Sequence, residues 1–98
     1  MAKSSGEYKL EVSPAAQRDL KRLPVNVAKE IIFEHLPEIQ KNPFAFSKPL
    51  VGGLRGEWSY AFGRRPEYRI IYYIRDNKII VTVIGTREGI YKLAKKRR

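Results

Sequence analysis

The chain has 98 residues, enough for one domain over residues 1–98 with a modest hydrophobic core. Its 20 Lys and Arg against 10 Asp and Glu give a formal net charge of +10, which favours a polyanionic partner, nucleic acid first. The lack of cysteine excludes a disulfide framework, a zinc knuckle and thiol catalysis, and no stretch approaches the ~20 apolar residues of a membrane span. Because no signal peptide follows Met1, we expect a cytoplasmic protein.

A strand and a helix are expected at the start of the chain, after a loose terminus at residues 1–6. Residues 8–12 alternate between polar and apolar side chains, as a strand with one buried face does. Ser13 and Pro14 are typical of a helix start, because Ser caps the first turn and Pro occupies the first helical position. This helix should end near Leu23. The inward-facing side chains of the strand are Tyr8, Leu10 and Val12.

A second helix is expected after Pro24, where apolar residues recur at helical spacing. Pro37 falls inside that pattern and predicts a kink or an early stop, and Asn42-Pro43 ends the helix. The lone histidine, His35, lies beside the apolar stripe and is interpreted as structural, since a dyad or a metal site needs further ligands. The buried stripe consists of Ala28, Ile31, Ile32, Leu36 and Ile39.

The middle of the chain predicts a long loop and then a strand. Residues 44–57 are rich in Pro and Gly, and so long a loop in a small domain is often functional or poorly ordered. Residues 58–62 alternate as a strand, with aromatic side chains on one side and the small Ser59 and Ala61 on the other. Residues 63–66 form a basic turn into the next strand.

Two further strands flank Asp76-Asn77, a pair suited to a tight two-residue hairpin turn. If these two residues form the loop, one face of the hairpin is apolar enough to be core, and Arg69 lies on the other. The predicted cross-strand pairs are Arg75–Lys78, Ile74–Ile79, Tyr72–Val81, Ile70–Val83 and Arg69–Ile84. The predicted core face consists of Ile70, Tyr72, Ile74, Ile79, Val81 and Val83.

Residues 90–96 predict a short C-terminal helix that leads into a basic run. The order of elements predicts an α+β fold, in which a twisted antiparallel β-sheet carries two N-terminal helices packed on one face and the short C-terminal helix. Helices can cover only the apolar face of such a sheet, so the face with Arg69 is expected to be open.

Arg69, Arg87 and Tyr91 are the candidate functional residues. The hairpin register brings Arg69 close to the segment after the last strand, and Arg87 and Tyr91 would share one side of a helix that starts near Glu88. Arg69 is either an ordinary surface arginine or a phosphate ligand on the open sheet. Tyr91 could instead pack, and Arg87 could pair with Glu88.

The remaining basic residues also allow two interpretations. The terminal run from Lys95 to Arg98 is either a solvated tail or one side of a basic groove. The residues expected to contact nucleic acid in such a groove are Lys48, Arg55, Arg64, Arg65, Lys92, Lys95 and Lys96.

Four short motifs, in their order and spacing, resemble the RelE/ParE superfamily of toxin–antitoxin toxins. The likeness covers nearly the whole chain, including the Ser-Pro-Ala-Ala start of the first helix and the Asn-Pro-Phe after the second. It implies the same compact fold, a twisted antiparallel sheet with two helices on one face. The motifs are Lys48-Pro-Leu50, Leu54-Arg-Gly-Glu-Trp58, Glu67-Tyr-Arg-Ile-Ile-Tyr72 and Ile84-Gly-Thr-Arg-Glu-Gly-Ile-Tyr91.

The resemblance also implies an activity. In the RelE branch it is a ribosome-dependent endoribonuclease that cuts mRNA in the A site, by attack of the 2′-hydroxyl on the adjacent phosphate, without a metal or cofactor. By motif match, Arg69 and Arg87 take the places of arginines that stabilise transition-state charge, and Tyr91 that of a tyrosine that stacks on a base or positions the reacting groups. The implied partners are the ribosome, mRNA and a cognate antitoxin, expected to present an acidic amphipathic segment to the open face.

The sequence departs from the family at the expected general base. RelE has two lysines where this chain has Ser59 and Ala61, and YoeB toxins have a glutamate in place of Lys48 and a C-terminal histidine that is missing here. Either Lys48, Arg64 or Arg65 supplies the charge from another position, or the activity is weak, or the target differs. The alternative function is that of a non-catalytic ParE-branch toxin, which inhibits DNA gyrase by protein–protein contact.

Overall fold

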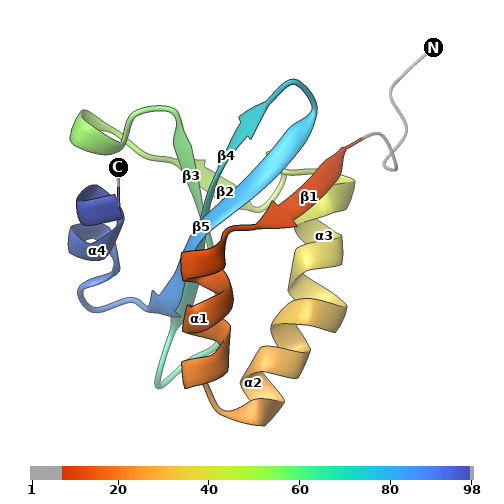
Figure 1. Ribbon diagram of the computed structural model, residues 1–98, viewed down its shortest axis with the longest axis vertical. Coiled ribbons are helices and arrows are strands. Elements are labelled where there is room, and N and C mark those ends of the chain that lie inside the picture. Colours follow the sequence, from red (N-terminus) through yellow and green to blue (C-terminus); the bar gives the residue numbers. More distant parts are fainter. Residues whose placement is uncertain (1–7, 98) are drawn as a thin grey trace.

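The computed structural model describes residues 8–97, so the expected loose terminus at residues 1–6 and the last residue, Arg98, lie outside the described residues. Five strands form one sheet in the order β1-β5-β4-β3-β2, and helices lie on both of its faces (Figure 1). The strands are β1 (Lys9–Val12), β2 (Ser47–Pro49), β3 (Glu57–Phe62), β4 (Tyr68–Arg75) and β5 (Lys78–Thr86). The helices are α1 (Pro14–Arg22), α2 (Val25–Glu30), α3 (Leu36–Lys41) and α4 (Ile90–Arg97), with a π-helical stretch at Ile31–His35 and a 3₁₀ turn at Gly52–Leu54. Within residues 8–97, no helix combines the length and the apolar character needed to cross a membrane.

The sheet is mixed, whereas an antiparallel sheet was predicted. β2, β3, β4 and β5 pair antiparallel, but β1 runs parallel to β5, with Lys9 opposite Lys78 and Val12 opposite Val81. Parallel neighbours need a long connection, and here the rest of the fold supplies it. The sequence also did not predict β2, because three residues within a loop rich in Pro and Gly are too few to reveal an alternating pattern.

The predicted hairpin turn is confirmed. Asp76 and Asn77 have φ angles of 52° and 64°, the left-handed region that a tight two-residue turn requires at both positions. Near this turn the register also agrees with the prediction, since Tyr72 lies opposite Val81.

Farther from the turn the predicted register is wrong, because β5 contains a β-bulge. Ile71 lies opposite Val83, so Thr82 is an extra residue in β5, and its Oγ1 donates a hydrogen bond to Ile71 O over 3.3 Å. One extra residue reverses the alternation of the side chains beyond it. Val83 therefore leaves the predicted core face, and Ile84 takes its place there.

The N-terminal helices cover one face of the sheet (Figure 1). Ser13 Oγ accepts a hydrogen bond from Ala16 N at 3.1 Å, which confirms the predicted cap of α1. α2, the π-helical stretch and α3 follow one another without a loop, and the π-helical stretch ends two residues before Pro37, where a kink was expected. Ile32 is 45% exposed, so its predicted place in the buried stripe is wrong, since the wider π-turn rotates the face that the helix buries.

The main core lies between these helices and the sheet. Tyr72 is fully buried in it, and its hydroxyl donates to Pro43 O at 2.6 Å and also hydrogen-bonds the Ser47 hydroxyl. The strand residues Tyr8, Leu10 and Val12 pack against this core, as predicted. Its buried members are Ala16, Ile31, Leu36, Ile39, Tyr60, Ile70, Tyr72, Ile79, Val81 and Ile84.

The opposite face of the sheet was expected to be open, but α4 packs on it. Ile71, expected at the surface, is fully buried there. α4 thus lies across the sheet from α2 and α3 (Figure 1). It leaves accessible the part of the face that holds Ala61 and Arg69. This second core consists of Leu54, Ile71, Val83, Ile90 and Ala94.

Candidate functional site

Arg69 projects from β4 and lies between Glu67 and Tyr91. Its cross-strand neighbours are Ala61 on β3 and Gly85 on β5, whose small size leaves room for the long side chain over the sheet. Its Nε donates to Glu67 Oε2 at 2.8 Å, and its Nη2 lies 2.7 Å from the same oxygen. Its Nη1 donates to the Tyr91 hydroxyl, and the guanidinium carbon lies 5.6 Å from the centre of that ring. Of the three predicted catalytic residues, the structure brings Arg69 and Tyr91 together.

These contacts leave Arg69 charged and able to bind an anion. Burial lowers the pKa of Arg69, but the hydrogen bonds and charges of Glu67 and Tyr91 outweigh it and raise the pKa above its ordinary value. A guanidinium has about five N–H donors, of which Glu67 takes two and Tyr91 takes one. The other two are therefore available to the oxygens of a phosphate or carboxylate.

Tyr91 comes from the first turn of α4, which its buried neighbours Ile90 and Ala94 attach to the sheet. The Tyr91 side chain is half-buried, and its hydroxyl also lies 3.4 Å from Ser59 Oγ on β3. The position of this ring therefore depends on how α4 docks.

Arg69 and Tyr91 line a cavity of about 420 Å³ that also contains Lys48. Lys48 lies on β2 opposite Ser59, on the same sheet face as Arg69, so the strand that was not predicted brings a lysine to the site. Among the described residues that line this cavity, Glu67 is the one carboxylate, and none is a histidine. The remaining lining residues are Phe46, Pro49, Leu50, Ser59 and Ala61.

Arg87 does not share that cavity. It lines a separate one of about 750 Å³ together with Arg64 and Arg65, and Glu67 belongs to both cavities. The main-chain N–H of Arg87 donates to Glu67 O at 2.9 Å, so this segment is tied to the start of β4. Because α4 begins only at Ile90, Arg87 precedes it, and the helical spacing expected for Arg87 and Tyr91 does not apply.

The other predicted cations also lie outside the cavity of Arg69. Arg55 lines a third cavity of about 310 Å³ with Arg75 and Arg97, next to Tyr73. The single basic groove that the sequence suggested is therefore divided into three hollows. The exposed lysines of α4 are Lys92, Lys95 and Lys96.

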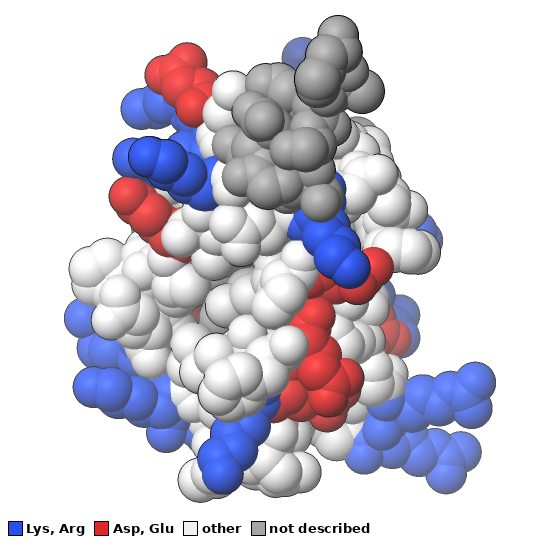
Figure 2. Space-filling view, turned by 90° about the vertical axis from the view of Figure 1, so that its right-hand side faces the viewer, with Lys and Arg blue, Asp and Glu red and all other residues white. Residues whose placement is uncertain are grey.

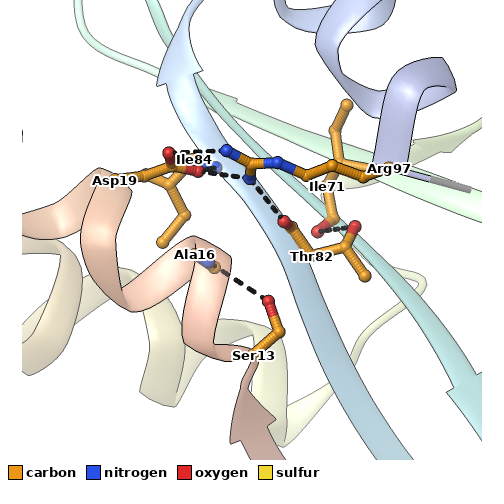
Figure 3. A network of polar contacts seen from close by, with 7 residues as sticks. All are labelled: Ser13, Ala16, Asp19, Ile71, Thr82, Ile84 and Arg97. Carbon is orange, nitrogen blue, oxygen red and sulfur yellow. Dashed lines mark hydrogen bonds and ion pairs between the residues drawn. The ribbon is translucent and has the colours of Figure 1, made fainter.

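Arg97 fixes the far end of α4 (Figure 3). Its guanidinium donates to both carboxylate oxygens of Asp19, at 2.8 and 3.0 Å, and to Thr82 O at 2.9 Å. Asp19 is 5% exposed and also accepts Ile84 N at 3.0 Å. The hydrogen bond to Asp19 raises the pKa of Arg97, although burial opposes it. The network joins α1, the bulge of β5 and α4, and so positions the helix that carries Tyr91.

Acidic residues gather on the side of the molecule where α2 and α3 lie, away from α4 (Figure 2). Burial raises the pKa of Tyr60, and so do the nearby charges of Glu38, Glu30 and Glu34. His35 lies between Tyr60 and Glu30, 2.8 Å from each, which agrees with its structural interpretation. No group of three or more acidic or histidine side chains within residues 8–97 could hold a metal ion.

Known proteins resemble this chain in both sequence and fold. A profile of the family described as "ParE toxin of type II toxin-antitoxin system, parDE" matches residues 10–91. The chain belongs to this toxin family. The toxin is 31% identical to Toxin RelE of Mycobacterium tuberculosis over 88 residues, covering 88% of each chain. It is 29% identical to Toxin RelG of the same organism, covering 87% of this chain and 97% of that one. The chain is therefore a RelE/ParE-superfamily toxin of a type II toxin–antitoxin system, as its motifs suggested.

Solved structures confirm the predicted fold class. A chain of the toxin–antitoxin complex RelBE2 from M. tuberculosis has a TM-score of 0.74 with 25% identity, covering 83% of this toxin and 99% of that chain. An arginine double mutant of E. coli toxin RelE in the free state has a TM-score of 0.72 with 24% identity, covering 93% and 97%. The α+β fold, with two N-terminal helices on one face and a short C-terminal helix, is that of these toxins.

The sequence interpretation did not single out Glu67. It precedes Arg69 by two residues, and side chains two apart on a strand share a face. That spacing alone would have placed a carboxylate beside the candidate phosphate ligand.

Proposed function

We propose that the toxin is an endoribonuclease that cuts mRNA in the ribosomal A site and so inhibits translation. The observation that carries this proposal is the cavity in which Lys48, Arg69 and Tyr91 converge from three separate elements. Two cations and unused N–H donors in one cavity suit a scissile phosphate, whose negative charge grows in the transition state. The similarity to toxins named RelE supports the same branch of the superfamily.

Each residue of the cavity has a role in this proposal. The RNA 2′-hydroxyl attacks the adjacent phosphorus, and Arg69 binds the phosphate oxygens as their charge increases. Lys48 adds a second positive charge and gives a proton to the departing 5′-oxygen. Tyr91 holds Arg69 through its hydroxyl and offers its ring to a base. These side chains supply the positive charge, so the proposal needs no metal ion or cofactor.

The remaining cations bind RNA around the cut. Arg87, with Arg64 and Arg65, acts from the neighbouring cavity on the phosphates that flank the scissile one. We place Arg87 there as a binding residue, since it lies apart from Arg69. The cations that extend this surface toward the ribosome and mRNA are Arg55, Lys92, Lys95 and Lys96.

A cognate antitoxin is expected to silence the toxin, since the family acts in toxin–antitoxin pairs and relatives have been solved as such complexes. Its acidic, amphipathic segment would neutralise the cations around Arg69 and the exposed lysines of α4. Because α4 covers part of the face expected to be open, the segment must lie over α4 or displace it. Its association rate should fall as salt rises.

Gyrase inhibition remains the second candidate function. The matching family profile is that of ParE toxins, and Ser59 and Ala61 stand where RelE has lysines. A gyrase inhibitor that acts by protein contact, however, has no need for two cations and a tyrosine around one cavity. We therefore rank the nuclease first.

Purified toxin added to a translating extract tests the choice. We expect mRNA breaks within codons of the translated region, and no breaks in a matched mRNA whose start codon is mutated. A parallel supercoiling reaction should proceed normally. Inhibited supercoiling together with intact mRNA would contradict the nuclease and favour the gyrase inhibitor.

A further inference from the structure

We propose that the Glu67 carboxylate is the general base that takes the proton from the attacking 2′-hydroxyl, and that it holds Arg69 in place before RNA binds. This inference rests on the proposed nuclease function. It assigns the role that the lysines missing at Ser59 and Ala61 leave unfilled.

Glu67 is the group in the cavity that is best suited to accept a proton. Of the described lining residues, it alone has a carboxylate, and the one histidine of the chain, His35, is hydrogen-bonded to Tyr60 and Glu30 elsewhere. The other polar groups of the lining are cations or hydroxyls. A general base must lie within hydrogen-bond reach of the proton it takes, which requires a place beside the phosphate ligand.

Glu67 has that place. A single oxygen, Oε2, lies 2.8 Å from Arg69 Nε and 2.7 Å from Nη2, so the carboxylate occupies one edge of the guanidinium. The remaining donors of Arg69 can bind the oxygens of a phosphate. The RNA hydroxyl and ester oxygens around that phosphate would then lie next to Glu67. The second carboxylate oxygen has no part in the contacts with Arg69, and the side chain is 32% exposed, so a hydroxyl can reach it.

The main chain and the surrounding charges keep Glu67 in position. Its carbonyl accepts the Arg87 N–H at 2.9 Å, which fixes the residue at the boundary of the two cavities. The cations that line the two cavities outnumber Glu88, the other acid there. Removal of the negative charge of Glu67 should therefore, by itself, strengthen RNA binding. The charged or titratable groups that line the two cavities with it are Lys48, Arg64, Arg65, Arg69, Arg87, Glu88 and Tyr91.

The reaction balances with groups that the cavity holds. Glu67 takes the 2′-hydroxyl proton as the 2′-oxygen forms its bond to phosphorus, and the bond from phosphorus to the 5′-oxygen breaks. The 5′-oxygen takes a proton from the Lys48 ammonium group. The products are a 2′,3′-cyclic phosphate and a 5′-hydroxyl, and solvent returns one proton to Lys48 and removes one from Glu67.

Single-turnover cleavage of mRNA on programmed ribosomes, measured across pH, tests this role. Glu67→Gln keeps an oxygen that Arg69 can donate to but cannot take a proton, so the rate should fall about 10²–10⁴-fold. The toxin concentration for half-maximal rate should stay the same or decrease. The wild-type rate should fall at acid pH, as expected of a reaction that uses a general base, and the residual rate of Glu67→Gln should lack that fall. Glu34→Gln, which removes an equal charge from the acidic side, is the matched control and should behave as wild type.

A second variant separates chemistry from folding. Glu67→Ala should also be slow, and added formate should restore part of its rate by acting as an external base, which a purely structural role would not allow. If Glu67→Gln keeps the wild-type rate and pH profile, or if formate restores nothing to a folded Glu67→Ala, the assignment of Glu67 is wrong while the nuclease stands. If wild-type toxin leaves the mRNA intact, the proposed nuclease function itself fails, and the assignment fails with it.

Discussion

Asp19 and Arg97, which are 78 residues apart in the chain, form an ion pair that attaches α4 to α1. Asp19 is nearly buried and accepts three hydrogen bonds, two from Arg97 and one from Ile84 N (Figure 3). The pair therefore holds one end of the helix whose other end presents Tyr91. Both the stability and the activity of the toxin should therefore depend on this ion pair.

Arg97→Ala should lower the free energy of unfolding by about 2–3 kcal/mol, because it leaves a buried carboxylate with one donor instead of three. The loss is smaller than for a fully buried pair because the Arg97 side chain is 23% exposed. Urea unfolding measures it. Lys96→Ala, an exposed neighbour on the same helix, is the control and should change stability by less than about 0.5 kcal/mol. Equal effects of the two variants would show that the pair contributes little.

Tyr91→Phe should slow cleavage roughly tenfold, because the ring stays while the hydrogen bonds to Arg69 and Ser59 are lost. Tyr91→Ala removes the ring as well and should slow cleavage by about 10²-fold or more, since Arg69 then loses its support. Single-turnover rates on programmed ribosomes separate the two roles. A Tyr91→Ala rate equal to that of wild type would exclude this residue from the site.

Lys48→Ala should reduce the cleavage rate about 10²–10³-fold, because Lys48 shares the cavity of Arg69 and acts there on the scissile phosphate. RNA binding should change little. Arg64→Ala, from the neighbouring cavity, should instead weaken RNA binding and lower the salt dependence of binding by about 0.7 in log–log slope. Measured rates and salt titrations distinguish these outcomes. The reverse pattern would mean that the scissile phosphate lies in the cavity of Arg64.

The stability of the toxin should fall at alkaline pH through Tyr72. Burial raises the pKa of Tyr72 to about 12, although the hydrogen bond to Ser47 opposes the rise. Between pH 10.0 and about 12 the folded chain then keeps a proton that the unfolded chain has lost, so stability is fully present below that window and decreases through it, by ~2–3 kcal/mol in total.

Urea unfolding of wild type and Tyr72→Phe over that pH range measures the effect. Tyr72→Phe should be the less stable variant at neutral pH, since Pro43 O loses its hydrogen-bond donor and the Ser47 hydroxyl loses its partner. The difference between the two proteins should narrow as pH rises. A difference that does not change with pH would mean that Tyr72 titrates normally in the folded chain.

The fold could be predicted where local signals decide it. Asp76 and Asn77 determine their turn by themselves, and Ser13 caps the helix that immediately follows it. The bulge at Thr82 has no such signal, because Arg97, from the far end of α4, hydrogen-bonds its carbonyl. The parallel pairing of β1 with β5 likewise depends on partners that only the folded chain brings together.

The candidate site could likewise be predicted only where local signals decide it. Motif and strand alternation sufficed to place Arg69 near Tyr91. Lys48 reached the cavity through an edge strand too short to be recognised, and Arg87 lies apart because α4 starts three residues after it. Glu67 could have been found from its spacing to Arg69, but its contact with the guanidinium is visible only in the structure.

The most direct test of the account is the cleavage of ribosome-bound mRNA by Arg69→Ala beside wild type. We expect wild type to leave a 2′,3′-cyclic phosphate and a 5′-hydroxyl, and Arg69→Ala to cleave at least about 10²-fold more slowly. Its melting temperature should be close to that of wild type, because the partly exposed side chain leaves no core cavity. A folded Arg69→Ala that cleaves within about threefold of the wild-type rate would contradict the central role of Arg69.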